Sequence, residues 1–571
     1  MLDKAQIAKI LDDCGTLLAL KGENDFRCRA YHNAARAIEQ YEGDFIGAVK
    51  RDELGHIPGI GDTLTAKIKE MVSTGKLAFH EKLQAEIPSG LVEMLRINGL
   101  GPKKIALLHE TKKINTVAEL KAACERDEIA GMKGFGAKTQ AKILEGIAFM
   151  DKVGNRFLLP DAEAIGLKLL ELVRSVPGVQ RSELCGSFRR RRETVADLDV
   201  LVSAKHPEKV MDAFTKAPEV QQILGRGPTK SSVLLNIGIQ ADIRVVEDDS
   251  FAFASHYFTG SKDHNIAMRQ RAIDQGLRLN EYALEGPKKK LAAKTEADLF
   301  KLLGLEYIPP ELRENTGEIA AAEKRTLPNL INLDDLVGTL HCHSTYSDGV
   351  NTLEEMALAA KKLGLKYLGI GDHSQSLGVA RGLTPERVKQ QWKEIDALNE
   401  KLKGIQLIKG TECDILVDGS MDFDDKLLAQ FDYVVASVHT HFTQTREQMT
   451  ERIIKALRHP SVSILGHATG RLLLKRDGYA LDLDAILKVA AETGTIIEIN
   501  AHPVRLDLDW LHVKQAKAMG VKFAINPDAH STEDIALLKY GIDVARRGWL
   551  TKEDVINTRP WEKAKKLMKQ R

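Results

Sequence analysis

The run LCGSFRRRRETVADLDV, residues 184–200, decides how the central part of the chain is interpreted. Asp197 and Asp199 are two residues apart within an apolar stretch. Residues i and i+2 of a strand project from the same face, so a strand here would direct both carboxylates to one place and Leu198 to the core. The run therefore predicts a paired-carboxylate site on a strand.

A second predicted strand supplies a third carboxylate. Residues 237–246 (IGIQADIRVV) alternate apolar and polar, which places Asp242 on the polar face of a neighbouring strand. Three carboxylates suit two Mg²⁺ ions, because hard cations prefer oxygen ligands and nucleotidyl transfer uses one ion at each reacting oxygen. An Asp-x-Asp pair alone is common on surfaces, and four arginines can be a solvated charge run. The preceding Gly186-Ser187 turn with arginines suited to triphosphate charge favours a nucleotidyltransferase.

A short glycine motif occurs three times in the first 150 residues, as IPGIG (57–61), INGLG (97–101) and MKGFG (132–136). Each copy opens a Lys-rich helical segment, where backbone N–H groups can bind a phosphate without contacting bases. A single copy is better explained as a hairpin turn with a capping glycine. Three copies favour sequence-independent DNA binding through Gly59, Gly61, Gly99, Gly101, Gly134 and Gly136.

Lys67 lies one helical turn after the first glycine motif. A lysine at this position is usually a solvated phosphate contact. The alternative, a nucleophile that forms a Schiff base, requires a lowered pKa. The sequence leaves both interpretations open.

Strand and helix patterns alternate strictly after Gly338. Such alternation predicts a parallel sheet, and seven units without an obvious edge strand favour a barrel. The seven apolar strand candidates lie around Thr339, Tyr367, Leu407, Val434, Ile464, Ile497 and Phe523.

Histidines and carboxylates follow these predicted strands at their carboxyl ends, the functional face of a parallel barrel. One buried histidine is usually structural, but a set of nine exceeds the four ligands of a tetrahedral zinc site and implies two or three ions, Zn²⁺ or Mn²⁺. The expected chemistry is attack of metal-activated water on a phosphoester. Arg471, His441 and His502 are candidate phosphate contacts. The nine candidate ligands are His341, His343, Asp348, His373, Glu412, His439, His467, Asp528 and His530.

Composition sets limits on the class of protein. The chain is 43 % hydrophobic and 28 % charged, a composition typical of globular proteins. Its 571 residues are too many for one domain. The six cysteines form no CxxC pair, and no long apolar run or secretory signal is visible, so we expect a cytoplasmic protein without membrane contact. Net charge is only +2, but ten of the seventeen histidines follow residue 338.

The motifs of residues 1–317 resemble family X DNA polymerases, the class of DNA polymerase β. The resemblance implies that Asp197, Asp199 and Asp242 bind the catalytic metals and that Gly186, Ser187 and Arg190 lie at the triphosphate. It also implies that Tyr257 and Gly260 flank the incoming sugar and that Asn265 and Arg269 check the nascent base pair. Gln240 is a departure, because polymerase β has an arginine there.

Residues 338–571 resemble the PHP (polymerase and histidinol phosphatase) domain, and all nine metal positions of that family carry a suitable residue here. The two resemblances together imply a multidomain chain. Its expected parts are an N-terminal all-α helix–hairpin–helix region (1–85 lyase-like, 86–155 fingers-like), an α+β nucleotidyltransferase palm (156–255), a thumb (256–317), a linker (318–337) and an α/β PHP barrel of the β7α7 type (338–571).

The implied function is filling of short DNA gaps in repair, with trimming of 3′ ends by a 3′–5′ exonuclease or phosphoesterase in the PHP domain. Expected cofactors are Mg²⁺ (or Mn²⁺) at the palm and two or three Zn²⁺ or Mn²⁺ at the barrel. Expected partners are gapped or primed DNA and dNTP, bound by a monomer. Two alternatives stay open. The first is a nucleotidyltransferase on a non-DNA acceptor with a separate phosphoesterase, and the second is a DNA-binding scaffold with both sites idle.

Overall fold

The computed structural model describes residues 2, 4–39, 41, 44–97, 99–287 and 290–568. The chain forms two compact units, residues 1–154 and 155–571. Asn98, in the second glycine motif, lies outside the described residues. Among the described residues, every helix is too short or too polar to span a lipid bilayer. All six cysteines are buried and free.

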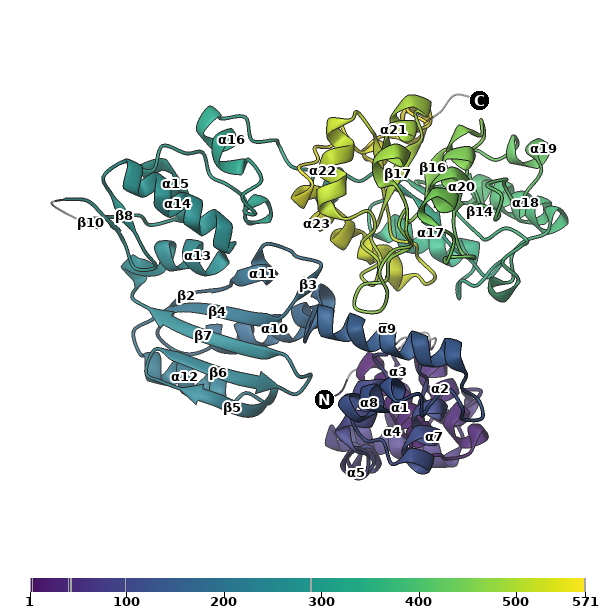
Figure 1. Cartoon of the computed structure of the whole chain (residues 1–571), viewed down its shortest axis with the longest axis horizontal. Coiled ribbons are helices and arrows are strands. Elements are labelled where there is room, and N and C mark those ends of the chain that lie inside the picture. The colour runs from purple at the N-terminus through teal and green to yellow at the C-terminus, as the bar shows by residue number, and fades with distance from the viewer. Residues whose placement is uncertain are drawn as a thin grey trace. The chain divides into compact units, whose positions relative to one another are not determined.

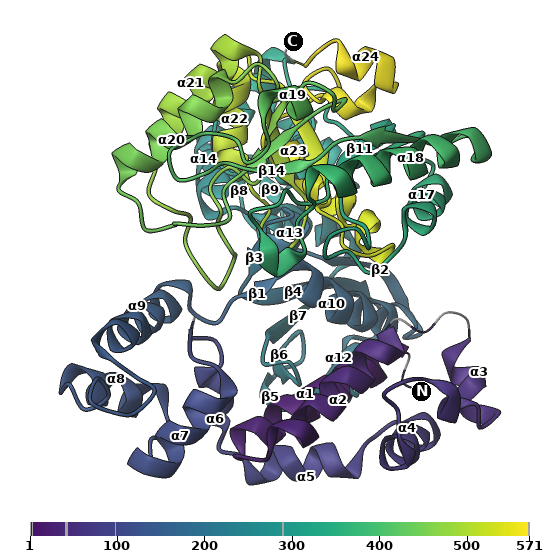
Figure 2. The same cartoon turned by 90° about the vertical axis from the view of Figure 1, so that its right-hand side faces the viewer.

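The first unit is helical throughout its described residues, as predicted. Helices α1 (Lys4–Leu20) and α2 (Asp25–Glu39) pack side by side (Figure 2). Their apolar faces and those of the later helices share one core, because Ile7, Leu11 and Ile68 are fully buried in the same cluster as Ile147. The other helices are α3 (Phe45–Lys50), α4 (Asp62–Thr74), α5 (Ala78–Glu86), α6 (Ser89–Met94), α7 (Pro102–Lys112), α8 (Val117–Glu125) and α9 (Ala137–Val153).

The three glycine motifs form the same turn. In each copy the backbone N–H of the fourth residue donates to the carbonyl of the first, at 3.0–3.1 Å: Ile60 to Ile57, Leu100 to Ile97 and Phe135 to Met132. The middle glycine of each copy has a φ between +81° and +91°, which an L side chain rarely adopts. The last glycine is the N-cap of α4, α7 or α9. The repeat therefore presents three equivalent helix starts.

A five-stranded sheet forms the start of the second unit, in the order β2 (Val179–Leu184), β4 (Asp197–Ala204), β7 (Gln240–Val246), β6 (Lys230–Leu235) and β5 (Val220–Arg226). Helices α10 (Leu159–Arg174) and α12 (Pro207–Thr215) pack on it (Figure 1). A two-stranded ribbon, β1 (Phe157–Leu158) with β3 (Thr194–Val195), lies beside α10. The short helix α11 (Gly186–Arg189) connects β2 to β3 and β4.

One strand boundary was predicted wrongly. The alternating pattern suggested a strand over residues 237–246, but β7 begins at Gln240. Gly238 has a φ of +86°, and Leu235 N–H donates to Ile239 O, so residues 236–239 form the hairpin turn between β6 and β7. Asp242 nevertheless keeps its predicted face.

Residues 251–324 form a second helical layer: α13 (Phe251–Thr259), α14 (Lys262–Asp274), α15 (Glu296–Leu302) and α16 (Glu318–Lys324), with a small sheet of β8 (Arg278–Leu279), β9 (Leu284–Glu285) and β10 (Lys290–Leu291). The segment expected as a linker, 318–337, is packed on both sides. Ala322 and Leu330 belong to the core of this layer, whereas Ile331 and Leu336 are buried in the cluster that includes the barrel residues.

Eight parallel strands, from Gly338 onward, form the predicted barrel, one more than the seven strand candidates of the sequence. The strands β11 (Gly338–Cys342), β12 (Tyr367–Ile370) and β13 (Gln406–Lys409) form one sheet. The strands β14 (Glu412–Asp414), β15 (Val435–Ser437), β16 (Ile464–Leu465), β17 (Ile496–Asn500) and β18 (Phe523–Asn526) form the other. Strand β13 matches the third predicted strand, and residues 410–411 separate it from β14, which the sequence did not predict. Bridges between His373 and Glu412 and between Cys342 and Ala529 join the two sheets at both sides.

Helices surround this barrel (Figure 2): α17 (Leu353–Lys362), α18 (Pro385–Lys401), α19 (Asp425–Leu428), α20 (Arg446–Arg458), α21 (Leu483–Thr493), α22 (Trp510–Ala518), α23 (Leu538–Arg547) and α24 (Trp561–Lys565). Inside, Leu340, Tyr367, Ile408 and Ile464 are almost fully buried in one cluster. The interior is therefore a packed core, and functional side chains must lie at the strand ends.

Candidate active sites

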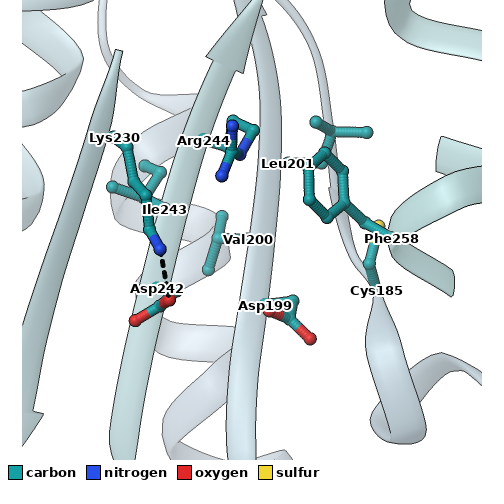
Figure 3. A pocket seen from close by; sticks show the side chains of 9 residues that line it. All are labelled: Cys185, Asp199, Val200, Leu201, Lys230, Asp242, Ile243, Arg244 and Phe258. Atoms are coloured by element: carbon teal, nitrogen blue, oxygen red, sulfur yellow. Dashed lines mark ion pairs between the residues drawn. The ribbon is translucent and has the colours of Figure 1, made fainter. Parts of the chain in front are cut away.

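The three palm carboxylates come together as the sequence predicts. Strands β4 and β7 are parallel, with Asp199 opposite Asp242 and Asp197 opposite Gln240. Adjacent strands are ~4.8 Å apart and paired residues share a face, so all three carboxylates project from one side. Asp199 and Asp242 lie side by side at the end of a pocket (Figure 3).

This carboxylate group holds excess negative charge. Burial, followed by repulsion from Asp197 and Asp242, raises the pKa of Asp199 to about 7. The Gln240 amide donates to Asp242 Oδ1 at 2.9 Å. Lys230, from β6, lies 3.3 Å from Asp242 Oδ2 and was not singled out by the sequence. Three carboxylates so close together form a site suited to divalent ions.

The Gly186 turn lies directly against Asp199. Cys185 N–H donates to Asp199 O at 2.7 Å, which fixes the turn to β4. Gly186 has a φ of +62°, and a Cβ added there would lie 2.3 Å from Asp199 Oδ2. Only glycine lets the backbone approach the carboxylate this closely.

Replacing Gly186 with alanine is therefore expected to displace the Asp199 carboxylate and lower nucleotidyl transfer by about 100-fold, since small misplacements of reacting groups cost that much. Single-turnover transfer assays on the purified variant measure this. Gly225→Ala is the matched control, because a Cβ at Gly225 meets nothing within 4 Å. Equal rates for Gly186→Ala and wild type would contradict the assigned close contact.

The expected nucleotide contacts lie on two segments, residues 186–190 and residues 257–269. A hydrogen bond from Arg190 joins the two segments. Arg190 is buried; its Nη1 donates to Thr259 O at 2.6 Å and its Nε to Glu314 Oε1 at 3.1 Å. On the second segment, Asn265 Nδ2 donates to Tyr257 O at 2.7 Å. Of the other expected contacts, Ser187 is half-buried, Gly260 follows Thr259 directly with a φ of +68°, and Arg269 is exposed on α14.

Glu412 is the centre of the barrel site. Its carboxylate is 1 % exposed and lies within 3.3 Å of four imidazole nitrogens. Those nitrogens belong to His341, His373, His439 and His467, which come from the ends of four different strands. Five of the nine predicted ligands therefore meet around one carboxylate.

The remaining four predicted ligands join the same cluster. His343 Nε2 lies 3.2 Å from Asp528 Oδ1, and Asp348 Oδ1 lies 3.5 Å from both His373 Nε2 and His530 Nε2. Three subsets can each direct one atom per residue toward a common ion: His343, Asp348, His373 and His530; His341, His343 and Asp528; His373, Glu412 and His439. The geometry thus fits two or three ions.

Two buried nitrogens that lack a hydrogen bond support this fit. His341 Nε2 and His343 Nδ1 are buried and have no hydrogen-bond partner among the described residues. Burial and the neighbouring His530 and His373 lower the pKa of His343 to about 3, so this imidazole is neutral and can ligate. Mixed imidazole and carboxylate donors suit Zn²⁺ or Mn²⁺.

The sequence missed three residues of this site. Glu498 accepts from His341 Nδ1 at 2.7 Å and Asp414 from His439 Nδ1 at 2.8 Å, an arrangement that orients imidazole ligands. Arg505 lines the pocket in front of the cluster, with Nε 3.5 Å from Asp528. Signals existed for the carboxylates, because Asp414 follows Glu412 at the same i, i+2 spacing and Glu498 is a charge within an apolar strand.

The candidate phosphate contacts at the barrel differ in position. Arg471 donates to the carbonyls of Arg505 and Leu506, so it supports the Arg505 loop. His441 is exposed, and His502 is half-buried and accepts from Val504 N–H. Arg505, in contrast, lines the pocket together with the candidate metal ligands.

Lys67 lies in the first unit beside an aromatic ring. Its Nζ is 3.8 Å from the centre of the Phe79 ring, which stacks on Tyr31. Burial lowers the pKa of Lys67, the direction that a nucleophilic amine requires.

A carboxylate group on a mixed sheet, a His-rich cluster that could hold metal ions on a barrel and three equivalent glycine turns at helix starts are together typical of one class: nucleotidyltransferases of the polymerase β type joined to a PHP phosphoesterase. Comparison with known families agrees. Residues 254–314 match the DNA polymerase beta thumb, and residues 339–502 match the PHP domain. Residues 3–77 match a helix–hairpin–helix domain, and residues 91–148 match a SAM-like helix–hairpin–helix tandem.

The chain belongs to the family X DNA polymerases that carry a PHP domain. It is 39 % identical over 574 residues to the "DNA polymerase/3'-5' exonuclease PolX" of Bacillus subtilis (strain 168), covering all of both chains. It is also 31 % identical over 235 residues to a "probable phosphatase" of Thermoanaerobacter sp. (strain X514), a match that covers 39 % of this chain and 91 % of that protein.

Proposed function

We propose that this protein is a DNA polymerase that fills short gaps during DNA repair and a 3′–5′ exonuclease that processes DNA ends through its PHP domain. The observation that carries the polymerase half is the pairing of Asp199 with Asp242 on adjacent parallel strands, beside Asp197. The observation that carries the nuclease half is the convergence of imidazoles on Glu412. Full-length likeness to a protein that carries both names supports joining the two activities.

In the polymerase half, Asp197, Asp199 and Asp242 would hold two Mg²⁺ (or Mn²⁺) ions. When bound, such ions lower the pKa of the primer hydroxyl and neutralise the leaving pyrophosphate. The chain itself contributes the fixed spacing of the three carboxylates and the Gly186 turn against Asp199.

The incoming dNTP is the proposed co-substrate. Ser187 and Arg190 would contact its triphosphate, and Tyr257 and Gly260 its sugar. Asn265 and Arg269 would contact the base pair. Two hydrogen bonds support this placement: Arg190 donates to Thr259 O, and the Asn265 amide donates to Tyr257 O. They connect the residues proposed to contact the triphosphate, the sugar and the base. We propose that the protein acts on its DNA as a monomer.

In the PHP half, the nine clustered side chains would hold two or three Zn²⁺ or Mn²⁺ ions, which when bound supply a hydroxide nucleophile and a charge clamp on the phosphate. Glu498 and Asp414 fix the orientation of His341 and His439. Arg505 is the proposed contact for the phosphate of the 3′-terminal nucleotide, because guanidinium geometry suits phosphate oxygens.

Metal binding at the PHP cluster is expected to release protons. Against the opposing effect of burial, Glu412 and Asp414 raise the pKa of His439 to about 10. Asp348 and Asp528 likewise raise the pKa of His530 to about 9 against burial. Against burial, Glu498 and Glu412 also raise the pKa of His341. A protonated imidazole must lose a proton to ligate, so metal affinity should increase with pH and protons should leave on binding at pH 7.

Calorimetric titration with Zn²⁺ or Mn²⁺ in buffers of different ionisation enthalpy measures this proton release. His459→Ala is the matched control, since His459 lies outside the cluster. Binding without proton release at pH 7 would contradict the assignment of His439 and His530 as ligands.

The three glycine turns of the first unit would bind DNA by its backbone. Each turn ends at the start of a helix of 11 to 17 residues, where N–H groups and the helix dipole favour phosphate. Lys67, which follows the first turn, is the proposed phosphate contact there.

Primer extension on a one-nucleotide gap tests the proposal. With Mg²⁺ and dNTP, we expect one-nucleotide extension of the gapped substrate and removal of 3′ nucleotides from a single strand when Mn²⁺ is supplied. Transfer of nucleotide to a non-DNA acceptor without primer extension would favour the alternative enzyme class. Loss of neither activity in the double variant Asp199→Asn, Glu412→Gln would assign the activities to other residues.

A further inference from the structure

Helix α23, in the PHP half, contacts Arg190 and Arg191 of the polymerase half. These two residues follow α11 and are called the arginine loop below. The helix and the loop belong to the same compact unit, residues 155–571. Arg547, near the end of α23, is fully buried, and its Nη1 donates to Arg190 O at 2.7 Å. The same Nη1 lies 3.2 Å from Glu314 Oε1, which also accepts from Arg190 Nε. Arg547 therefore touches Arg190 directly and through a shared carboxylate.

A second contact from α23 holds the next residue of the arginine loop. Arg191 pairs with Asp543 Oδ2 at 2.7 Å and with Glu163 Oε1 at 2.8 Å. Glu163, on α10 of the palm, also accepts from Lys539 Nζ and Tyr540 OH of α23, both at 2.9 Å. Arg190 and Arg191 are thus each held by a side chain of α23, in the PHP half.

These contacts are poorly explained as stabilisers of the fold alone. Burying an arginine costs desolvation that an ion pair barely repays, and apolar residues of similar size often stabilise as well. What a buried, bidentate-capable guanidinium provides is a fixed geometry. The geometry fixed here is that of Arg190. This residue ends the short helix that begins at Gly186, and the Gly186 backbone lies against Asp199.

We propose that α23 is a positioning element of the polymerase site, in which Arg547 and Asp543 hold Arg190 and Arg191 in the conformation that binds the triphosphate. The proposal rests on the polymerase function proposed above and goes beyond it, because it makes nucleotide binding depend on the PHP half. Arg547 and Asp543 are positioning residues, since neither contacts the reacting atoms.

The test compares Arg547→Ala with Arg546→Ala in the full chain. Arg546 is the adjacent residue of α23 and pairs with Glu311 at 2.8 Å and with Asn332 at 2.9 Å, so it is a matched interface arginine that binds other partners. We expect Arg547→Ala to raise the KM for dNTP about tenfold in gap filling. Arg546→Ala should stay within twofold of wild type, and exonuclease kcat/KM on single-stranded DNA should stay within twofold for both variants.

Asp543→Asn keeps the side-chain shape and carries the test if Arg547→Ala does not fold; we expect a threefold or larger rise in the KM for dNTP. Arg547→Lys should recover part of the loss, because one donor still reaches Arg190 O. An unchanged KM for dNTP in a folded Arg547→Ala, or in Asp543→Asn where that variant carries the test, would overturn the proposal. So would equal falls of both activities in Arg547→Ala and Arg546→Ala, which a merely structural role predicts. A wild-type chain that extends no primer would instead refute the polymerase function itself.

Discussion

Asp199→Asn is expected to lower gap filling by ~10³-fold or more while leaving exonuclease activity on single-stranded DNA unchanged. The substitution removes a charge that lies between Asp197 and Asp242 and would hold both metal ions. Losing part of a two-metal site costs several kcal/mol of transition-state stabilisation, and each 1.36 kcal/mol is tenfold in rate. Quench-flow extension of a gapped primer with saturating dNTP measures the loss.

The same variant should unfold at a higher temperature than wild type when divalent ions are chelated. The pKa of Asp199 is raised to about 7 in the folded chain, so the folded state binds its proton more tightly than the unfolded state. That contribution to stability is complete below the unfolded pKa of ~3.9 and is lost as pH increases through 7. At pH 8 the charged carboxylate is a cost that asparagine removes.

Calorimetry at pH 8 in EDTA therefore separates a catalytic effect from misfolding. Asp249→Asn is the control, because Asp249 is an exposed acid shortly after β7. A variant that loses gap filling and also unfolds earlier than wild type would indicate disruption of the sheet and contradict the assignment.

Glu412→Gln is expected to abolish the exonuclease, by ~10³-fold or more, with gap filling retained. Glu412 contacts four imidazoles from four strands and is 1 % exposed, so its loss affects four candidate ligands at once. Glutamine has the size of glutamate but lacks the negative charge that contacts the four imidazoles.

Release of the 3′-terminal nucleotide from a labelled single strand measures this loss, and metal content by mass spectrometry should fall with it. Glu400→Gln, an exposed position on α18, is the matched control. Full exonuclease activity with one metal fewer would show that the reaction does not need the Glu412 subset.

Much of both sites follows from spacing alone. The period of two in a strand places Asp197 with Asp199, and the rule that functional residues follow barrel strands gathers nine ligands from residues 341–530. What spacing cannot give is the pairing of strands distant in sequence. Lys230 lies close to Asp242 because β6 pairs with β7. The positive φ of Gly238 places residues 237–239, which were expected in the strand, in a hairpin turn before β7.

The contacts between the two halves were equally invisible in the sequence. Arg547 and Arg190 are 357 positions apart, and nothing in the local pattern of α23 separates a buried arginine from the surface arginines typical of a helix end. The domain boundaries expected within residues 1–155 stay predictions, because the described helices there share one apolar core.

Anomalous X-ray scattering from Mn²⁺ in crystals of the protein with gapped DNA and a non-hydrolysable dNTP analogue tests the central claim most directly. We predict two manganese peaks ~3.5–4 Å apart between β4 and β7, with oxygens of Asp197, Asp199 and Asp242 as ligands. A triphosphate bound elsewhere, or peaks that leave any two of these carboxylates without metal, would contradict the account.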